Sequence, residues 1–370
     1  MHFIHLMEPR MTKDMIDSIN MSLTSERFLN GESVSKFEEE FASYIGTKSA
    51  ISVNNGTNAL LISLLALDVK QGDFIITTPA TFIATVNSIK LAGAEPLLVD
   101  IKMDDYNIDP EQIKACLETY GNSVSGIIPV HLYGRPAPMN KVLSIAEQNN
   151  IFVIEDACQA HGAEFSGKRA GSLGSSGAFS FYPSKNMTVA GDGGMITTND
   201  SEIAEKSRIL RDSGRSTGKK YEHEVIGFTA RLNTINAAFG REQLKGLPDQ
   251  VKKRKHNASM YFDLLSSCDE IILPQKDDKI YSSGWHQFVI RNPKRDGLAR
   301  YLLDAGIETG IHYPIPVHLQ PVYKKIGIKT FGTLKNSERW AKEILSIPVH
   351  GNLEDNDIHY IAEKILEYFR

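Results

Sequence analysis

The chain has 370 residues, of which 41% are hydrophobic and 23% charged, and this composition is ordinary for a folded globular protein and excludes a disordered one. A net charge of −4 gives no support for a nucleic-acid surface, and the basic run 252–255 fits a solvated helix face. The three cysteines lack metal-ligand spacing, so we expect reduced thiols and no metal site. With apolar runs far shorter than a bilayer requires, we expect no membrane segment and a cytoplasmic protein.

Short apolar strands alternate with helical stretches over the first part of the chain. The expected strands are Ser49–Val53, Phe74–Thr77, Pro96–Val99, Gly126–Val130 and Ile151–Glu155. Helix-ending pairs such as Gly72-Asp73 and Gly93-Ala94 precede them. This alternation predicts an α/β fold with a mostly parallel sheet.

The pattern changes after about residue 230. A long helical stretch from Leu232 towards Leu265 is followed by a strand over 285–290 and by helices near 295–305, 337–345 and 355–368. We therefore predict a large domain over residues 1–245 and a smaller C-terminal α+β domain over residues 246–370.

Lys185 lies 29 positions after Asp156, which closes the apolar strand 151–156. Ser180 precedes the lysine by five positions. A lysine that forms a Schiff base, a carboxylate that holds a pyridinium nitrogen and a hydroxyl for a phosphate are the groups that bind pyridoxal 5′-phosphate (PLP). Each residue alone has an ordinary structural explanation, but the three together predict a covalent cofactor site.

A phosphate site is predicted where a helix begins after the first strand. Gly56 and Thr57 lie at that helix N-terminus, where free backbone amides face outward, and the hydroxyl of Ser180 is expected to bind the same phosphate. The same residues would also make a well-capped turn without any ligand. The Gly191–Gly194 stretch precedes the strand 195–198, so we interpret it as a tight turn beside the cofactor rather than a dinucleotide loop.

Ordered motifs along nearly the whole chain resemble one family. They are Lys36–Ala42, Asn55–Leu60, Pro79–Thr85, Pro129–Gly134, Glu155–Gly162, Ser180–Asn186, Gly191–Gly194, Gly310–Pro314 and Ser346–His350. The chain resembles the DegT/DnrJ/EryC1/StrS family of PLP-dependent sugar aminotransferases. The resemblance implies the aspartate-aminotransferase type of fold, known as fold type I, with a large PLP-binding domain.

The resemblance also implies roles for the cofactor-site residues. Lys185 would form the Schiff base and then move the proton between the amino donor and the cofactor, and Asp156 would keep the pyridine nitrogen protonated. Phe82 would stack on the ring face, and Gln159 would hydrogen-bond the phenolic oxygen of the ring. Without the motifs, Phe82 would be an ordinary core aromatic and Gln159 an ordinary polar loop residue.

Family members complete the phosphate site across a dimer interface with a Gly-x-Asn-x-Arg stretch. Here the stretch is 227–231: Arg231 matches, whereas Thr229 replaces the asparagine and has a shorter reach. We therefore expect a homodimer with shared active sites.

The resemblance implies candidate substrate-binding residues near the sugar end of the site, although a histidine or tyrosine at a strand end is more often a packing residue than a ligand. They are His131, Tyr133, His312 and Tyr313. Cys158, next to the cofactor aspartate, is expected to be a small packing residue.

The resemblance implies an aminotransferase that moves an amino group from L-glutamate, or from glutamine, to a keto group of a nucleotide-linked deoxysugar. One alternative is a PLP-dependent sugar dehydratase, but such relatives carry histidine in place of the Schiff-base lysine. A second alternative is an aminotransferase whose keto substrate carries no nucleotide. A third is a non-enzymatic binding or regulatory protein on the same scaffold. The choice of nucleotide, and of carbon three or carbon four, depends on the shape of the pocket.

Overall fold

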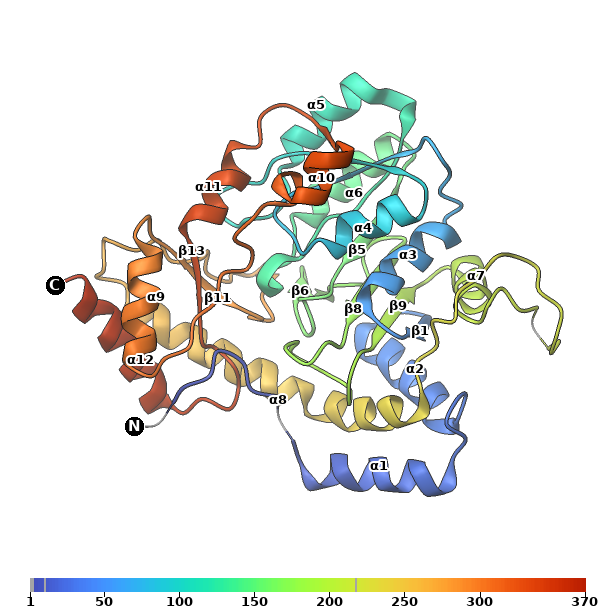
Figure 1. Cartoon of the computed structure of the whole chain (residues 1–370), viewed down its shortest axis with the longest axis horizontal. Coiled ribbons are helices and arrows are strands. Elements are labelled where there is room, and N and C mark those ends of the chain that lie inside the picture. The colour runs from blue at the N-terminus through green and yellow to red at the C-terminus, as the bar shows by residue number, and fades with distance from the viewer. Residues whose placement is uncertain (1–2, 10, 217) are drawn as a thin grey trace.

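The computed structural model describes residues 3–9, 11–216 and 218–370. Its described part is built around an eight-stranded sheet with the order β1-β9-β8-β5-β4-β2-β3-β12 (Figure 1). The strands are β1 Ser49–Val53, β2 Phe74–Thr77, β3 Glu95–Leu98, β4 Val124–Ile127, β5 Phe152–Asp156, β8 Ser176–Ser180, β9 Gly194–Thr198 and β12 Lys329–Thr330. Only β9 pairs antiparallel, with β1 and with β8, so the prediction of a mostly parallel sheet is confirmed.

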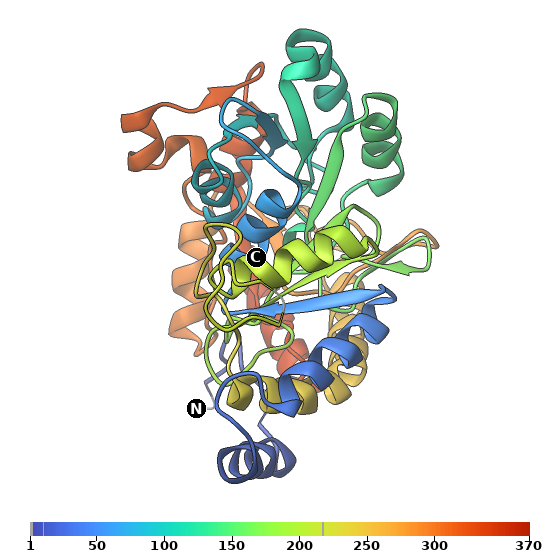
Figure 2. The same cartoon turned by 90° about the vertical axis from the view of Figure 1, so that its right-hand side faces the viewer.

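Helices cover both faces of this sheet (Figure 2). One face carries α3 (Gly56–Ala66), α4 (Ala84–Leu91) and α7 (Ser201–Arg211). The other carries α2 (Glu32–Ile45), α5 (Pro110–Tyr120), α6 (Met139–Gln148) and the first part of α8 (Thr234–Leu264). The helix α1 (Lys13–Ser25) packs on α8. Burial on both faces explains why the central strands are continuous apolar runs rather than alternating ones.

The smaller domain is a second core at the far end of α8. The strands β11 (Phe288–Arg291) and β13 (Ile344–Ile347) pair antiparallel, and α9 (Arg295–Asp304), α11 (Lys335–Glu343) and α12 (Asp355–Tyr368) surround them. Its fully buried side chains include Tyr261, Phe288 and Ile361. The predicted helix 337–345 is wrong at its end, because Ile344 already begins β13.

The remaining elements are short. They are β6 Glu164–Phe165, β7 Lys168–Arg169, β10 Tyr281–Ser282, η1 Gly121–Ser123, η2 Leu132–Gly134, η3 Val317–Leu319 and α10 Pro321–Ile326.

The helix α8 runs through the predicted domain boundary at residue 245 without a break. The apolar side chains of α8 belong to the large core as far as Val251 and to the small core from Ala258 onward. The chain also crosses between the domains elsewhere: Ile4 lies in the small core, and β12 pairs with β3 of the large sheet. The domains are therefore not two consecutive segments.

Throughout the described residues, no helix combines the length and the apolar character needed to cross a membrane.

Candidate active site

Asp156 ends β5, in the middle of the large sheet, and its carboxylate is buried. Thr85 Oγ1 lies 2.7 Å from Oδ2 and donates to it, and the backbone N–H of Cys158 donates to Oδ1 at 3.2 Å. Because β5 is central and parallel to its neighbours, the loops at its carboxyl end meet above this carboxylate. The strand thus supplies a rigidly held carboxylate.

Lys185 lies in the turn after β8, and its backbone N–H donates to the carbonyl of Tyr182. Burial lowers the pKa of its amine, while the nearby Cys158 and Asp156 act in the opposite direction. Desolvation disfavours the ammonium form, so the amine loses its proton more easily than a surface lysine. A nucleophilic or proton-accepting lysine needs this property.

The start of α3 forms a cradle with Ser180. Asn55 caps the helix by accepting from the N–H of Asn58, and the amides of Gly56 and Thr57 precede the first intrahelical bonds. A Cβ at Gly56 would lie only 2.7 Å from Ser180 Cβ, so the helix start and the serine are in close contact. Free amides, a helix dipole and a hydroxyl together fit a phosphate group.

Phe82 and Gln159 lie around Tyr313. The ring of Phe82 is 52% exposed, and its centroid lies 5.6 Å from that of Tyr313. Gln159 Oε1 accepts from the N–H of Tyr133 at 2.8 Å, and its Nε2 donates to Tyr313 Oη at 3.3 Å. The phenyl ring is open to a stacking partner, and the amide of Gln159 retains a second N–H for another acceptor.

The placement of His131 does not fit the predicted substrate contact. Its ring is 0% exposed. The N–H of Ala137 donates to Nδ1 at 3.0 Å, so Nε2 carries the proton and donates to Glu155 at 2.9 Å. Both ring nitrogens are hydrogen-bonded within the chain, and through Glu155 the ring stabilises the end of β5.

Tyr133 is buried as well, and its predicted substrate contact stays a prediction. Its hydroxyl donates to the carbonyl of His312. His312 remains partly exposed, with Nδ1 hydrogen-bonded to Ser346 Oγ at 2.9 Å. Burial and the charge of Lys185 lower the pKa of His312 to about 4, so its imidazole is neutral at pH 7. Of the four predicted substrate residues, His312 and Tyr313 are the two that keep partly exposed side chains.

Several groups beside Lys185 were not identified from the sequence. Thr85 binds the Asp156 carboxylate, and Asn186 and His286 bond to each other next to the lysine. Thr85 and Asn186 lie inside the motifs Pro79–Thr85 and Ser180–Asn186. These motifs predicted that both residues lie near the cofactor site, but they did not indicate what either side chain does there. His286 comes from the small domain, and no spacing in the sequence links it to Lys185.

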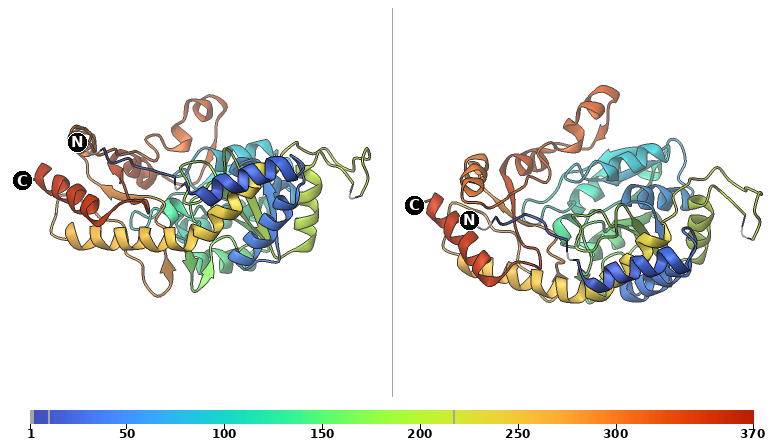
Figure 3. Two further views of the ribbon diagram at one scale, coloured as in Figure 1. Left: turned by 90° about the horizontal axis from the view of Figure 1, so that it is seen from below. Right: turned by 60° about the horizontal axis from the view of Figure 1, so that its bottom comes forward.

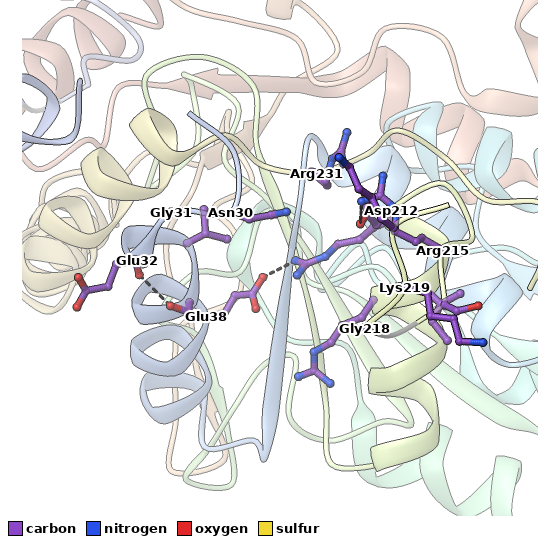
Figure 4. Close-up of a pocket in the computed structure, with 16 residues that line it drawn as sticks. Asn30, Gly31, Glu32, Glu38, Asp212, Arg215, Gly218, Lys219 and Arg231 are labelled. Carbon is purple, nitrogen blue, oxygen red and sulfur yellow. Dashed lines mark hydrogen bonds and ion pairs between the residues drawn. The ribbon is translucent and has the colours of Figure 1, made fainter. Parts of the chain in front are cut away.

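Thr229 and Arg231 follow the loop that projects after α7 (Figure 3), and the carbonyl of Ala230 between them accepts from the N–H of Asn54 at 2.8 Å. Arg231 pairs with Asp212, and Thr229 Oγ1 lies 3.3 Å from Ser213 Oγ. The loop borders an open hollow of about 660 Å³ (Figure 4). Its described lining includes six cationic side chains, Arg208, Arg211, Arg215, Lys219, Lys220 and Arg231, and three carboxylates, Glu32, Glu38 and Asp212.

The hollow keeps unused hydrogen-bond donors. Arg215 Nε, Ser216 Oγ and Arg231 Nε are buried and have no partner among the described residues. Together with the six cationic side chains, they make the lining of the hollow rich in hydrogen-bond donors. The phosphate contacts of Thr229 and Arg231 stay a prediction.

The sequence matches the DegT/DnrJ/EryC1/StrS aminotransferase family over residues 9–366. It is 42% identical over 350 residues to a "Pleiotropic regulatory protein" of Geobacillus stearothermophilus, which covers 94% of this chain and 92% of that protein. It is 38% identical over 359 residues to the dTDP-3-amino-3,6-dideoxy-alpha-D-galactopyranose transaminase of Aneurinibacillus thermoaerophilus. This match covers 97% of this chain and 96% of the transaminase. The crystal structure of NtdA from Bacillus subtilis with bound cofactor PMP superimposes with a TM-score of 0.87 at 29% identity, covering 96% of this chain and 82% of that one.

The family match spans nearly the whole chain and agrees with the fold. The Asp156 carboxylate, the Lys185 amine and the cradle of Gly56 and Ser180 fit PLP, the cofactor whose amino form is pyridoxamine 5′-phosphate (PMP). The chain belongs to the DegT/DnrJ/EryC1/StrS aminotransferase family and is a PLP-dependent aminotransferase.

Proposed function

We propose that this enzyme transfers an amino group from L-glutamate to a keto group of a nucleotide-linked deoxysugar, working as a homodimer in the cytoplasm. One observation carries the proposal: Asp156, Lys185 and the Gly56–Ser180 cradle meet at the carboxyl end of β5 in a chain of this family. The dTDP-amino-sugar named for the Aneurinibacillus relative supports the substrate class. The expectation of glutamate comes from the sequence resemblance.

Each proposed role follows from the chemistry of the side chain. The cofactor, when bound, supplies a carbonyl that takes up the nitrogen and a ring that withdraws electrons. Asp156, held as an acceptor by Thr85 and Cys158, holds a proton at the ring nitrogen. Lys185 moves a proton at the reacting carbon, because its lowered pKa lets it act as a base and then as an acid.

The surrounding residues bind and orient. Gly56, Thr57 and Ser180 would hold the phosphate, Phe82 would cover one face of the ring, and Gln159 would donate its remaining N–H to the phenolic oxygen.

Two features support a homodimer. Arg231 lines a hollow that contains six cationic side chains, and segments next to this hollow expose apolar side chains. Phe28 is 64% exposed beside Thr234, whose N–H donates to the Phe28 carbonyl, and Ile226 of the projecting loop is 94% exposed. A second copy of the chain would cover the apolar side chains while Arg231 completes its phosphate site.

The test uses glutamate labelled on its α-nitrogen and a panel of nucleotide keto-sugars. We expect the label in an amino-sugar product, with 2-oxoglutarate formed in equal amount, as measured by mass spectrometry. Lys185→His should lose this catalytic transfer, since imidazole cannot replace the amine. An unlabelled, deoxygenated sugar would instead establish the dehydratase. The amine of Lys185 argues against that outcome, and turnover of the panel would also argue against a purely regulatory protein.

A further inference from the structure

A short segment of the small domain lies directly behind the lysine loop. The N–H of Gly284 donates to the carbonyl of Gly134 at 2.8 Å, and the N–H of Gln287 donates to the carbonyl of Tyr133 at 3.3 Å. The segment then continues into β11. Residues 284–287 therefore connect the small domain to the loops that surround the cofactor site.

Asn186, the residue after Lys185, is joined to this segment at both ends of its amide. Its Nδ2 donates to the carbonyl of Gly284 at 2.7 Å, and its Oδ1 lies 3.2 Å from His286 Nδ1. Since the amide oxygen only accepts, Nδ1 of His286 carries the proton. Both side chains are buried, so neither bond competes with water.

The segment itself is held in place by its surroundings. Arg254 of α8 is buried, and its Nη1 donates to the carbonyl of Trp285 at 3.1 Å. A Cβ at Gly284 would lie 2.8 Å from the carbonyl oxygen of His161, so the two backbones touch.

Trp285 has a φ of 46°, a conformation that is unfavourable for a large side chain. Its ring packs against Phe262 and Phe288, and its Nε1 donates to Asp277. Packing that enforces such a backbone geometry is found where a structure must place neighbouring groups accurately.

We propose that Asn186 and His286 are a positioning pair, which fixes the Lys185 loop against the segment 284–287 and so keeps the lysine side chain in its partly buried position. The pair acts through Lys185 and does not touch the reacting atoms. The inference rests on the proposed role of Lys185, and it assigns a function to two residues outside the cofactor cradle.

The consequence concerns the proton affinity of Lys185. The titratable groups that interact with the amine are Asp156, Cys158, His161, His286 and His312. Burial lowers the pKa of all three histidines, so they are neutral at pH 7 and add no charge of their own. Burial is also the main cause of the lowered pKa of Lys185, so a released loop would expose the amine to water and raise that pKa.

The experiment measures acetylation of Lys185 by trace acetic anhydride as a function of pH, on the full-length chain freed of cofactor. Peptide mass spectrometry gives the pH midpoint for Lys185, with the exposed Lys252 as an internal standard. We expect Asn186→Ala and His286→Leu to raise the Lys185 midpoint by about one pH unit. His286→Asn should keep the wild-type midpoint, because its amide replaces the lost Nδ1–H donor.

Asn257→Ala is the matched control. Asn257 is a buried amide of α8 that donates to the carbonyl of His350 at 2.9 Å, away from the lysine loop. It should lower stability without moving the Lys185 midpoint. Wild-type midpoints in both Asn186→Ala and His286→Leu would overturn the proposal, as would an equal shift in Asn257→Ala or His286→Asn. If Asn186→Ala does not fold, the two His286 variants decide. The readout needs no substrate, so it is independent of the proposed reaction.

Discussion

Two hydrogen bonds fix the side chain of Asp156 at the position where it would contact the cofactor. Its oxygens accept from Thr85 and from the backbone of Cys158, and both bonds hold the buried carboxylate in one orientation. A carboxylate held in a fixed orientation can pair with a pyridinium nitrogen. The two donors differ, because a hydroxyl can be removed by mutation and a backbone amide cannot.

We expect Asp156→Ala to retain part of its cofactor and to lose turnover by about 10²-fold or more, since a positioned proton partner contributes that much. Single-turnover reaction with glutamate, followed by the cofactor absorption, measures the loss. Thr85→Val serves as the milder variant, because it removes one donor and leaves the carboxylate. Half-reaction rates in Asp156→Ala close to those of the wild type would contradict the role.

His161 poses a different question at the same scale. Its ring is buried against Phe179 and Phe181. Burial, with the charges of Lys185 and Arg254, lowers its pKa from 6.5 to about 3. The folded protein therefore keeps this imidazole neutral, at the expense of its stability in acid.

This shift makes stability depend on pH. Between about pH 3 and 6.5 the unfolded chain binds a proton at His161 that the folded chain does not, so the free energy of unfolding falls on acidification. His161→Leu should reduce this slope by about 1 kcal/mol per pH unit. Urea unfolding at several pH values measures it. His359→Gln, at an exposed position, should leave the slope unchanged. An unaltered slope in His161→Leu would refute the account.

Among the elements, α3 has the most direct link to cofactor binding. Its first turn presents the amides of Gly56 and Thr57, and its apolar side chains are buried against β8 and β9. The helix start is thereby fixed in position relative to Ser180.

Gly56→Ala tests that arrangement. The added methyl would lie 2.7 Å from Ser180 Cβ and 3.0 Å from Cys158 Sγ, so the helix start and the serine must move apart. We expect the affinity for PLP to fall about tenfold or more, the loss of one good hydrogen bond to a charged group. Asn55→Ala is the control, since it weakens the cap by about 1 kcal/mol without adding volume. Fluorescence titration measures the affinity of each variant for PLP. Equal affinities in Gly56→Ala and Asn55→Ala would contradict the proposed role of Gly56 and Ser180 in binding the phosphate.

The elements also show what the sequence could predict. The strand Ser49–Val53 and the helix Asp355–Tyr368 have the predicted bounds, because clear turn residues and caps mark their ends. The pairing of Lys329–Thr330 with β3 was missed, because a two-residue strand has no periodicity of its own.

The site follows the same rule. Local motifs predicted the cofactor residues, and of these Gly56 does lie in contact with Ser180. His131 and Tyr133 were placed on the substrate side, but burial is a tertiary property, and the partners Glu155 and His312 that occupy these side chains could not be read from the motif. His286 was missed because its contact with Asn186 spans 100 positions.

At the scale of the whole molecule, the proposed sharing of sites gives a complementation test. Lys185→Ala chains and Arg231→Ala chains should each be severely impaired, for lack of the amine and of the partner-supplied guanidinium. Mixed, they should form hybrid dimers in which one site has both residues, so that activity recovers towards a quarter of the wild-type value on random pairing, as expected for a two-fold dimer. Differently tagged chains allow the hybrid to be isolated and assayed. Hybrids no more active than the sum of the parents would count against shared sites.

The repeated crossing of the chain between its two domains has a mechanical consequence. Ile4 is bridged to Ile307 of the small domain, α8 spans both cores, and the segment 317–331 returns to the large sheet, where the N–H of Phe331 donates to the carbonyl of Leu98. Two domains joined by one connection can rotate about it as a hinge, whereas several connections at separate points restrict such a rotation. The lobes should consequently move and unfold as one cooperative body, and a fragment ended at residue 245 would lose the edge strand β12, the second half of α8 and the anchor of its own N-terminal segment together.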